Sequence, residues 1–248
     1  MSNKNNNDEI IKDDISNGRI ADNPNYFSKI FPENILNKFE IYSYRSAAAI
    51  LYQTFPEQFK DIISALENLQ ITKTMIRTLG GSKGPIAKHV DDLFDTEKWV
   101  ETRISADLIV KLHHAKTNNT FSEYTRKGYL DGHRIDFVSG RVAFDLEWNS
   151  KDQTYDRDLY AFSAFYEAGA IDVGVVLTRG SSLNNKFFKS LGRVLNQDGK
   201  SEGKTYVYQK FGASTTWMGK LLYRLDAGRN GGCPILALGI TPKCVNDK

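Results

Sequence analysis

The chain has 248 residues, of which 40% are hydrophobic and 12% aromatic. That content provides a packed core and excludes general disorder, and the length fits one large domain. The 33 basic and 30 acidic side chains leave a formal net charge of only +3, which excludes a histone-like polycation. Any binding of nucleic acid therefore requires positive charge concentrated on one face.

The start of the chain, MSNKNNNDEIIKDD, is polar and lacks the apolar run of a secretory signal. We expect residues 1–25 to form a polar arm and residues 26–248 to form a single domain. No stretch approaches the ~20 apolar residues that cross a bilayer, so we expect a cytoplasmic protein. The two cysteines, Cys233 and Cys244, lack metal-binding spacing and are expected to be buried packing residues.

The N-terminal third, residues 26–103, is predicted to be mainly helical. The runs SYRSAAAILYQTF and PEQFKDIISALENLQITKTMI carry apolar residues three and four positions apart. Pro56 suits the first turn of the second helix. A glycine-rich break follows at Gly80–Pro85, and residues 107–129 are polar and expected to be rich in loops.

The predicted catalytic core covers residues 104–180. Two strands, Arg134–Val138 and Arg141–Trp148, are joined at Ser139 and Gly140, and a helix follows in DRDLYAFSAFYEAG. The apolar run IDVGVVLT is typical of a buried strand, so strand, helix and strand predict a right-handed crossover to a parallel neighbour.

The last part of the predicted domain covers residues 181–248. It contains a polar glycine loop near 198–204, a helix over 215–225, a second glycine loop at 228–232 and the apolar strand PILALGI. The chain as a whole is therefore expected to be an α/β protein with a mixed central sheet flanked by helices.

An acidic cluster is predicted on the two strands of the core. The strand RVAFDLEWN alternates, which places Asp145 and Glu147 on one face. A two-residue turn at Ser139 and Gly140 sets Asp136 opposite Ala143 on that face, diagonal to Asp145 at about 7–8 Å.

These three acids repel one another unless a cation or a basic partner neutralises them. Magnesium prefers oxygen ligands and keeps several waters, so two carboxylates and a backbone carbonyl suffice to hold it. Such an ion activates water and stabilises charge on a phosphate. The alternative is a solvated strand face, on which Arg134, opposite Asp145, forms a cross-strand ion pair.

The run IDFVSGRVAFDLEWNSKDQTYDRDLYAF, followed by IDVGVVLTR, resembles the BglII and BstYI branch of restriction endonucleases, within the PD-(D/E)XK nuclease superfamily. The run GASTTWMGKLLYRLDAGRNGGCPILALGI is similar to the C-terminal part of the same group. The resemblance implies a type II restriction endonuclease that cuts a short DNA palindrome as a homodimer with magnesium. It also implies a companion methyltransferase that protects the host.

In this resemblance Asp136 falls at the first acid and Asp145 at the second, and the carbonyl of Leu146 completes the metal site. The third position, often lysine, is Glu147, as in a BamHI-like arrangement. Our hypothesis is that Glu147 orients or deprotonates the attacking water, or adds a ligand. Lys151 supplies positive charge if the chain folds back after Asn149.

Several residues are candidates for DNA contact. Lys83 and Lys88 flank a glycine-rich loop that lacks P-loop spacing and is equally well explained as an ordinary turn. A helix start near Ser214, Thr215 and Thr216, with Lys220 and Arg224 on the helix, would suit a phosphate. Arg229 and Asn230 lie in a glycine-rich turn, and these residue types read guanine and adenine.

Three other functions remain open. A structure- or damage-directed nuclease of the same superfamily would nick mismatches instead of producing discrete fragments. A catalytically inert DNA-binding protein would bind without cleaving. A sugar hydrolase with two carboxylates would work in the presence of a chelator.

Overall fold

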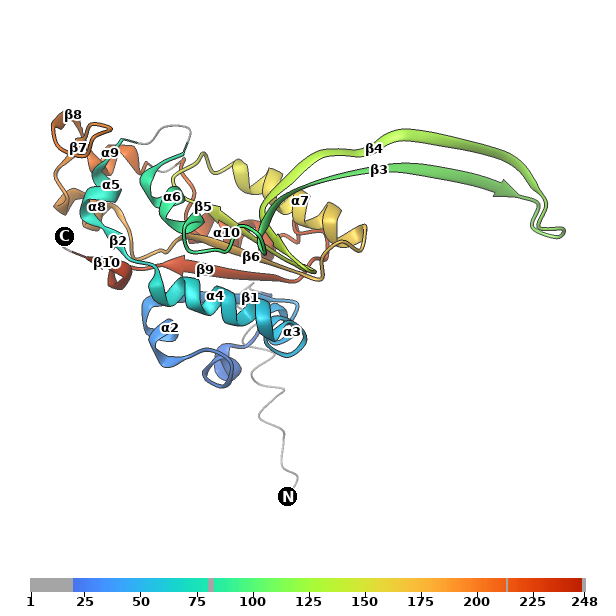
Figure 1. The fold of residues 1–248 in the computed structure, drawn as a ribbon, viewed down its shortest axis with the longest axis horizontal. Helices are drawn as coiled ribbons and strands as arrows, with labels where there is room; N and C mark the ends of the chain where they lie inside the picture. Colours follow the sequence, from blue (N-terminus) through green and yellow to red (C-terminus); the bar gives the residue numbers. More distant parts are fainter. Residues whose placement is uncertain (1–19, 80–82, 213, 247–248) are drawn as a thin grey trace, which may run out of the picture.

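We describe a computed structural model of the chain, which covers residues 20–79, 83–212 and 214–246 (Figure 1). Its centre is a six-stranded sheet with the order β1-β9-β6-β5-β4-β3. The strands are β1 (Phe39–Tyr44), β3 (Val100–His113), β4 (Thr120–Ser139), β5 (Val142–Glu147), β6 (Val173–Arg179) and β9 (Ile235–Ile240). Strands β5, β6 and β9 run parallel, whereas β1, β4 and β3 pair antiparallel. The predicted mixed sheet is confirmed.

Helices cover both faces of this sheet (Figure 1). On one face lie α2 (Glu33–Lys38), α3 (Ala47–Thr54) and α4 (Pro56–Asn68), and on the other α7 (Thr154–Glu167) and α10 (Met218–Asp226). Pro56 is the first residue of α4, as predicted. The sheet is therefore the middle of three layers, with one hydrophobic core on each side.

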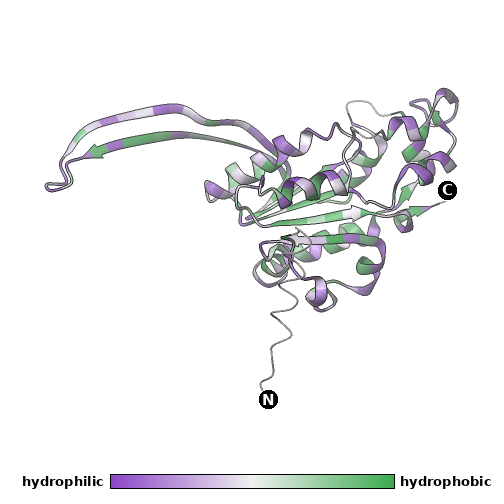
Figure 2. Cartoon of the chain, turned by 180° about the vertical axis from the view of Figure 1, so that it is seen from behind, coloured by the Kyte–Doolittle hydropathy of each residue, from purple (hydrophilic) through white to green (hydrophobic). Residues whose placement is uncertain are grey.

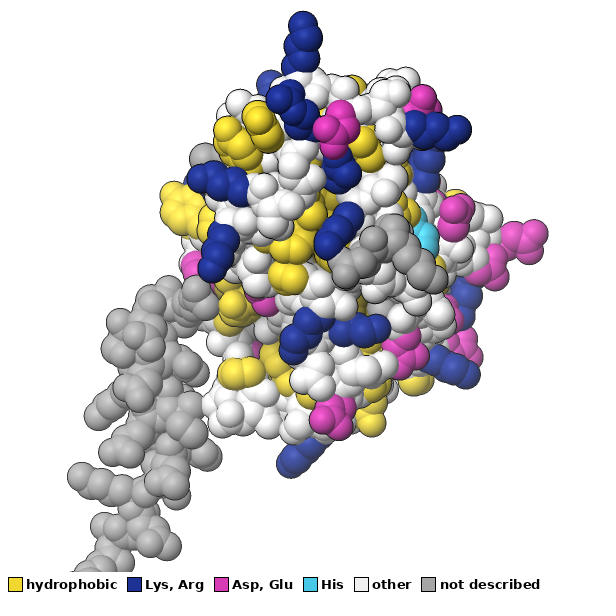
Figure 3. All heavy atoms as spheres, turned by 90° about the vertical axis from the view of Figure 1, so that its left-hand side faces the viewer, with side chains coloured by type: hydrophobic (Ala, Val, Ile, Leu, Met, Phe, Trp, Pro, Cys, Tyr) yellow, Lys and Arg dark blue, Asp and Glu magenta, His cyan; other side chains and the backbone are white. Residues whose placement is uncertain are grey.

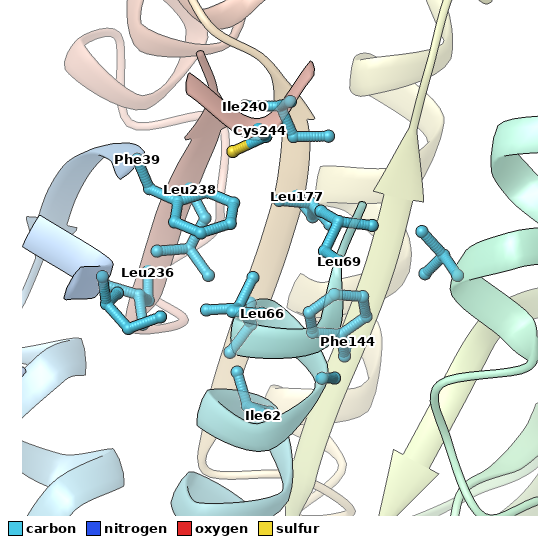
Figure 4. Packing of buried hydrophobic residues seen from close by; sticks show 14 of the residues in the cluster. Phe39, Ile62, Leu66, Leu69, Phe144, Leu177, Leu236, Leu238, Ile240 and Cys244 are labelled. Atoms are coloured by element: carbon cyan, nitrogen blue, oxygen red, sulfur yellow. The ribbon is translucent and has the colours of Figure 1, made fainter. Parts of the chain in front are cut away.

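The first core lies between α4 and the sheet (Figure 4). Ile62 and Leu66 of α4 pack there with Phe144 of β5, Leu177 of β6 and Leu236 of β9, all buried. The full burial of one such side chain contributes about 1.5–3 kcal/mol. Because side chains alternate along a strand, the packing of Phe144 on this side directs its neighbours in β5 to the opposite layer.

The second core lies between the sheet and helices α7 and α10. Leu159, Phe162 and Phe165 of α7 pack with Leu221 and Leu225 of α10 against the other face of the sheet. The predicted crossover is confirmed in that α7 connects the parallel neighbours β5 and β6.

The smaller elements lie around these layers. They are η1 (Pro24–Lys29), β2 (Ile71–Thr72), α5 (Lys73–Arg77), α6 (Pro85–Asp91), α8 (Asn185–Ser190), β7 (Arg193–Leu195), β8 (Glu202–Tyr206), α9 (Val207–Lys210), η2 (Pro242–Cys244) and β10 (Val245–Asn246). Strand β2 pairs with β10, and β7 pairs with β8. In the described residues no helix is long and apolar enough to span a membrane. Both cysteines are free and buried, as predicted.

Strands β3 and β4 form a long hairpin that projects from the body, which we call the arm (residues 100–139; Figure 1). The prediction of loops over residues 107–129 is therefore wrong. Hydrophobic and hydrophilic residues intermingle along the arm (Figure 2). Ion pairs between the strands, Arg103–Asp131 and Lys111–Glu123, occupy many of its charges. The following large apolar side chains of the arm remain exposed: Val100, Ile109, Leu112, Phe121, Tyr124 and Tyr129.

Other boundaries also differ from the sequence-based expectation. The region predicted to be mainly helical contains β1, and the loop expected at 198–204 is partly strand β8. Helix α10 begins at Met218, three residues later than predicted. The helix in the crossover ends as expected, with Gly169 at a φ of 72°.

We predict that Gly174→Ala destabilises the fold, because a Cβ at Gly174 would lie 2.6 Å from Phe162 Cδ1 and 2.8 Å from Ile235 Cδ1. Forcing a methyl group into this contact should lower the free energy of unfolding by about 1–3 kcal/mol. Urea denaturation measures the change. Gly212→Ala is the control, since its Cβ would meet nothing closer than 3.9 Å. Equal stability of the two variants would contradict the packing described for α7.

Candidate active site

A tight turn brings β4 and β5 together. The turn residues are Gly140, with a φ of 57°, and Arg141, since Ser139 pairs with Val142. The predicted turn is therefore wrong by one residue. Ala143 pairs with Val138 and not with Asp136, and the ladder ends at Phe137 and Phe144, so that Asp136 and Asp145 are the residues next to its last pair. The shift keeps the parity of the strands, so the two acids still meet on one side.

The arm contains a β-bulge beside this pair. Between Val100 and Thr102 the β3–β4 register shifts, so that Glu101 faces two residues of β4. Ile135 consequently packs in the second core, whereas Phe137, two residues later, packs in the first. The backbone N–H of Asp136 donates to Asp145 Oδ1 at 3.1 Å.

Six acidic residues line one pocket of about 430 Å³ on the α7 side of the sheet. Glu101 and Asp131 pair with arginines of the arm, and the other four carboxylates belong to Asp136, Asp145, Glu147 and Asp158 of α7. Asp145, Glu147 and Asp158 are only 5%, 7% and 4% exposed. Sequence reasoning missed Asp158. It precedes the predicted core residue Leu159, so its position on the buried side of the helix was the signal that could have revealed it.

The pocket contains too little positive charge for its acids. Arg157 Nη2 lies 2.8 Å from Asp158 Oδ1 and 3.9 Å from Glu147 Oε1, but its side chain is 70% exposed. The predicted alternative pair of Arg134 with Asp145 does not form, because Arg134 pairs with Glu101 at 3.2 Å.

Burial raises the pKa of all four carboxyl groups. The pKa of Asp145 is raised well above its usual value, mainly by burial and then by the negative charge of Asp136. Burial, and then the charge of Asp158, raise the pKa of Glu147 to about 8. Burial likewise raises the pKa of Asp136 and of Asp158. The site therefore favours protons or another positive charge among its acids.

The chemistry of the pocket fits a hard cation. Glu147 Oε2 and Asp158 Oδ2 are buried and have no hydrogen-bond partner among the described residues. Carboxylate oxygens are the ligands that magnesium prefers. Within those same residues, no group of three or more His, Cys, Asp or Glu side chains is spaced to hold a metal ion. An ion here would need water or a backbone carbonyl in addition to two carboxylates.

The backbone of Leu146, the residue expected to supply such a carbonyl, continues β5 beyond its last pair with β4. In an antiparallel ladder, alternate residues direct their N–H and C=O groups to the same neighbour. Ser139 and Val142 close the two-residue turn, so Val142, Phe144 and Leu146 direct these groups toward β4. The β4–β5 ladder ends at Phe137 and Phe144, which leaves Leu146 without a pairing residue on β4.

Asn149 and Lys151 follow the acids. Asn149 has a φ of 61°, and its buried Oδ1 has no partner among the described residues. It lines a second pocket, of about 550 Å³, with Asp136, Leu146 and Lys83. Lys151 is exposed and lines neither pocket, so the structure does not bring it to the acids.

The candidate DNA-contacting residues of the N-terminal part lie near this second pocket. Lys83 lines it and pairs with Asp91, and Lys88 is exposed on α6. Residues 80–82 of the glycine-rich break lie outside the described residues.

The predicted phosphate-binding helix start needs correction. Trp217, not Ser214 or Thr215, is the N-cap of α10. Thr216 is fully buried, and its hydroxyl accepts from the backbone N–H of Ser150 at 3.2 Å. Ser214 is exposed and Thr215 half-buried. Lys220 on α10 pairs with Asp152 at 3.3 Å.

Two candidates for DNA contact prove to be interior residues. Arg224 is 6% exposed and pairs with Asp156 at 2.8 Å. Asn230 is buried and donates to the carbonyl of Cys233 at 2.6 Å, so it cannot read a base. Both residues bind other parts of the same chain. Arg229 pairs with Asp156 at 2.7 Å but stays partly exposed.

Comparison with known families identifies the same region. A family model described as restriction endonuclease BglII/BglIII matches residues 39–240. The match extends from β1 to β9 and includes all six acids of the pocket. No curated protein matches the chain significantly.

We predict that, in metal-free buffer, the acids make stability fall as pH rises. A folded-state pKa raised from 4.5 to about 8 at Glu147 gives stability that is complete below pH 4.5 and lost as pH rises toward 8. Glu147→Gln should therefore be more stable than the unmutated chain at pH 8 by at least about 1 kcal/mol, the equivalent of one pKa unit. The advantage should shrink at pH 5. Urea denaturation at both values tests this, and an unchanged difference would refute it.

Proposed function

Since the chain belongs to the BglII/BglIII restriction endonuclease family and is thus a type II restriction enzyme, we propose that it makes sequence-specific double-strand cuts in DNA by divalent-metal-dependent phosphodiester hydrolysis. The observation that carries this proposal is that Asp136 shares a pocket with three buried carboxylates, Asp145, Glu147 and Asp158, two of which have oxygens without a partner in the described chain.

We propose magnesium as the ion, held by Asp136, Asp145 and the carbonyl of Leu146. When bound, such an ion lowers the pKa of a water and neutralises charge on the phosphate. The chain contributes the positions of the ligands. The N–H of Asp136 orients the Asp145 carboxylate, and the bulge directs Asp136 away from the β3–β4 ladder.

Glu147 is proposed to orient the attacking water or to take its proton. Its Oε2 is buried and free to accept, and its raised pKa suits a group that gains a proton near neutral pH. Asp158, fixed by Arg157, keeps the Glu147 carboxyl in a negative environment. Asn149 is a candidate for support because its unpartnered Oδ1 faces the same region, whereas Lys151 would first have to move.

We also propose that the enzyme is a homodimer on a short palindrome, since two-fold symmetric proteins match symmetric sites. The exposed surface of the arm supports the proposal that a second copy of the chain binds there. A two-stranded hairpin alone is at best marginally stable in water, and this one exposes large apolar side chains. Three of its six lysine and arginine side chains, Arg103, Lys111 and Arg134, pair with acids of the neighbouring strand. A methyltransferase that protects the host DNA completes the proposed restriction system.

We predict that Asp145→Asn abolishes cleavage of plasmid DNA in magnesium and leaves duplex binding largely intact. Asp136→Ala should do the same, because either change removes a carboxylate from the proposed ion. Glu147→Gln should cut at least about 100-fold more slowly, the usual contribution of a general base. Gel analysis of plasmid digests and binding in calcium provide the two measurements.

Lys60→Gln is the control for these variants, since Lys60 is exposed on α4 and does not line the acid pocket. Lys151→Ala should keep most activity if Glu147, and not Lys151, acts on water. Activity of the unmutated chain in a chelator would refute the metal requirement. Smears or nicks at mismatches, in place of discrete fragments, would favour the structure-directed nuclease.

We predict that Leu112→Lys combined with Tyr124→Lys weakens self-association, because both apolar side chains are exposed on the arm. Sedimentation should show a dimer for the unmutated chain and a shift toward monomer for the double variant. Lys116→Gln at the arm tip is the control. A monomer without the substitutions, or a dimer that they leave unchanged, would exclude the arm as the dimer contact.

A further inference from the structure

One buried arginine lacks an acidic partner. Arg179, the last residue of β6, is 4% exposed. Its Nε donates to the carbonyl of Thr216 at 3.2 Å, and its Nη2 donates to Thr215 Oγ1 at 3.0 Å. The guanidinium carbon lies 5.2 and 5.4 Å from the ring centres of Phe188 and Phe211. No carboxylate pairs with it among the described residues.

This arrangement leaves a positive charge in the interior without a counter-charge. Neutral oxygens and aromatic rings stabilise a guanidinium, but they do not neutralise it, and burial of an unpaired charge is expensive. Burial accordingly lowers the pKa of Arg179 to about 10. Arg224 is buried to a similar degree and is neutralised by Asp156. Arg179, moreover, lines a pocket.

The pocket beside Arg179 has a volume of about 440 Å³. Its lining includes Ser181, Asn184, Tyr208 and Lys220, and no described lining residue is acidic. The nearest acids are already engaged: Glu40 accepts from the amides of Ser181 and Ser182, and Asp152 pairs with Lys220.

Helix α10 begins at the wall of this pocket, since Trp217 and Lys220 both line it. The first amides of a helix have no carbonyl partner within the helix. Trp217, the N-cap, makes no side-chain hydrogen bond to them. The amide of Lys220 donates to the Trp217 carbonyl at 2.9 Å, which leaves the amides of Met218 and Gly219 as the donors at this helix start. A second positive element is therefore next to the buried arginine.

We propose that this pocket is a phosphate site in which Arg179, Lys220 and the first turn of α10 bind one phosphate oxyanion. The proposal rests on the proposed function for the source of that anion, which is a phosphate of the DNA backbone near the cleavage position. Thr178, the residue before Arg179, donates its hydroxyl to the carbonyl of Glu147 at 2.8 Å. The phosphate pocket and the acid pocket are thus joined through adjacent residues of β5 and β6.

The surrounding end of the molecule is suited to a polyanion. Figure 3 shows lysine and arginine side chains dispersed over it. Residues 181–212 contain six basic side chains, Lys186, Lys189, Arg193, Lys200, Lys204 and Lys210, against two acidic ones, Asp198 and Glu202. A phosphate held by Arg179 would fix the position of the duplex relative to the acids, because phosphate contacts set register and orientation.

The first experiment uses inorganic phosphate and the whole chain, without DNA or cleavage. Phosphate should raise the melting temperature saturably relative to chloride at equal ionic strength, because it binds the folded state. Lys220→Gln should weaken the apparent phosphate affinity several-fold, and Arg179→Gln should abolish the effect. Lys204→Gln, an exposed lysine that does not line the pocket, is the matched control.

Absence of a saturable effect, or an equal effect in Lys220→Gln and Lys204→Gln, would overturn the proposal. If Arg179→Gln does not fold, Arg179→Lys and Lys220→Gln decide the outcome. Arg179→Lys keeps the charge but loses the two-pronged geometry, so it should bind phosphate more weakly than the unmutated chain.

The second experiment assigns the phosphate to DNA. On an Asp145→Asn background, Lys220→Gln should reduce the slope of log Kd against log salt for a labelled duplex by about 0.9, the loss of one phosphate contact. Lys60→Gln, an exposed lysine on α4 outside this region, serves as the control. An unchanged slope with intact phosphate binding would overturn DNA as the source. A chain that binds phosphate through Arg179 but does not cut DNA would leave the pocket supported and refute the proposed nuclease function.

Discussion

Strand β5 must satisfy two opposite environments along six residues. Val142 and Phe144 face the core with α4, and Asp145 and Glu147 face α7. Alternation makes this possible only while the strand stays regular. The apolar side chains of β5 are buried well enough to hold the strand in place. The acidic side chains on its other face are therefore buried with them. The cost of burying these acids is met by packing elsewhere in the sheet.

The position of α7 decides how deep the acid pocket becomes. Phe162 lies directly against Gly174 of β6, where no other residue would allow so close an approach without a shift. That contact brings Asp158 up to Glu147 and makes the pocket more negative. The next residues of β6 beyond the apolar run, Thr178 and Arg179, then place a hydroxyl on the Glu147 carbonyl and a cation beyond it. The unit β5–α7–β6 therefore positions both the carboxylates of the acid pocket and the buried cation of Arg179.

Elements that depend on the pattern of neighbouring residues could be predicted from the sequence. Features that depend on pairing between strands far apart in the sequence could not. Strand β5, the crossover helix and β6 follow from period-two and period-3.6 patterns and a continuous apolar run. The bulge at Asp136 depends on β3, some thirty-five residues earlier, so nothing near Asp136 signals it. The arm was not predicted because most of its side chains are exposed and give no core-facing pattern. Apolar and polar residues do alternate over residues 104–112, which is typical of a strand. The lack of an acid near Arg179 is visible only once α8, α9 and α10 are assembled around it.

Separation of the two pockets resolves an electrostatic conflict. Three buried carboxylates and the exposed Asp136 repel a phosphate, so the acid pocket alone disfavours DNA whenever no cation is present. A polyanion therefore has to gain its affinity outside that pocket, and the acid-free region around Arg179 and Lys220 is close enough to do so. If the duplex is anchored there, a cation that enters among Asp136, Asp145 and Glu147 reduces the repulsion for the same DNA. Binding of DNA and binding of the cation must then strengthen each other to the same degree, by linkage.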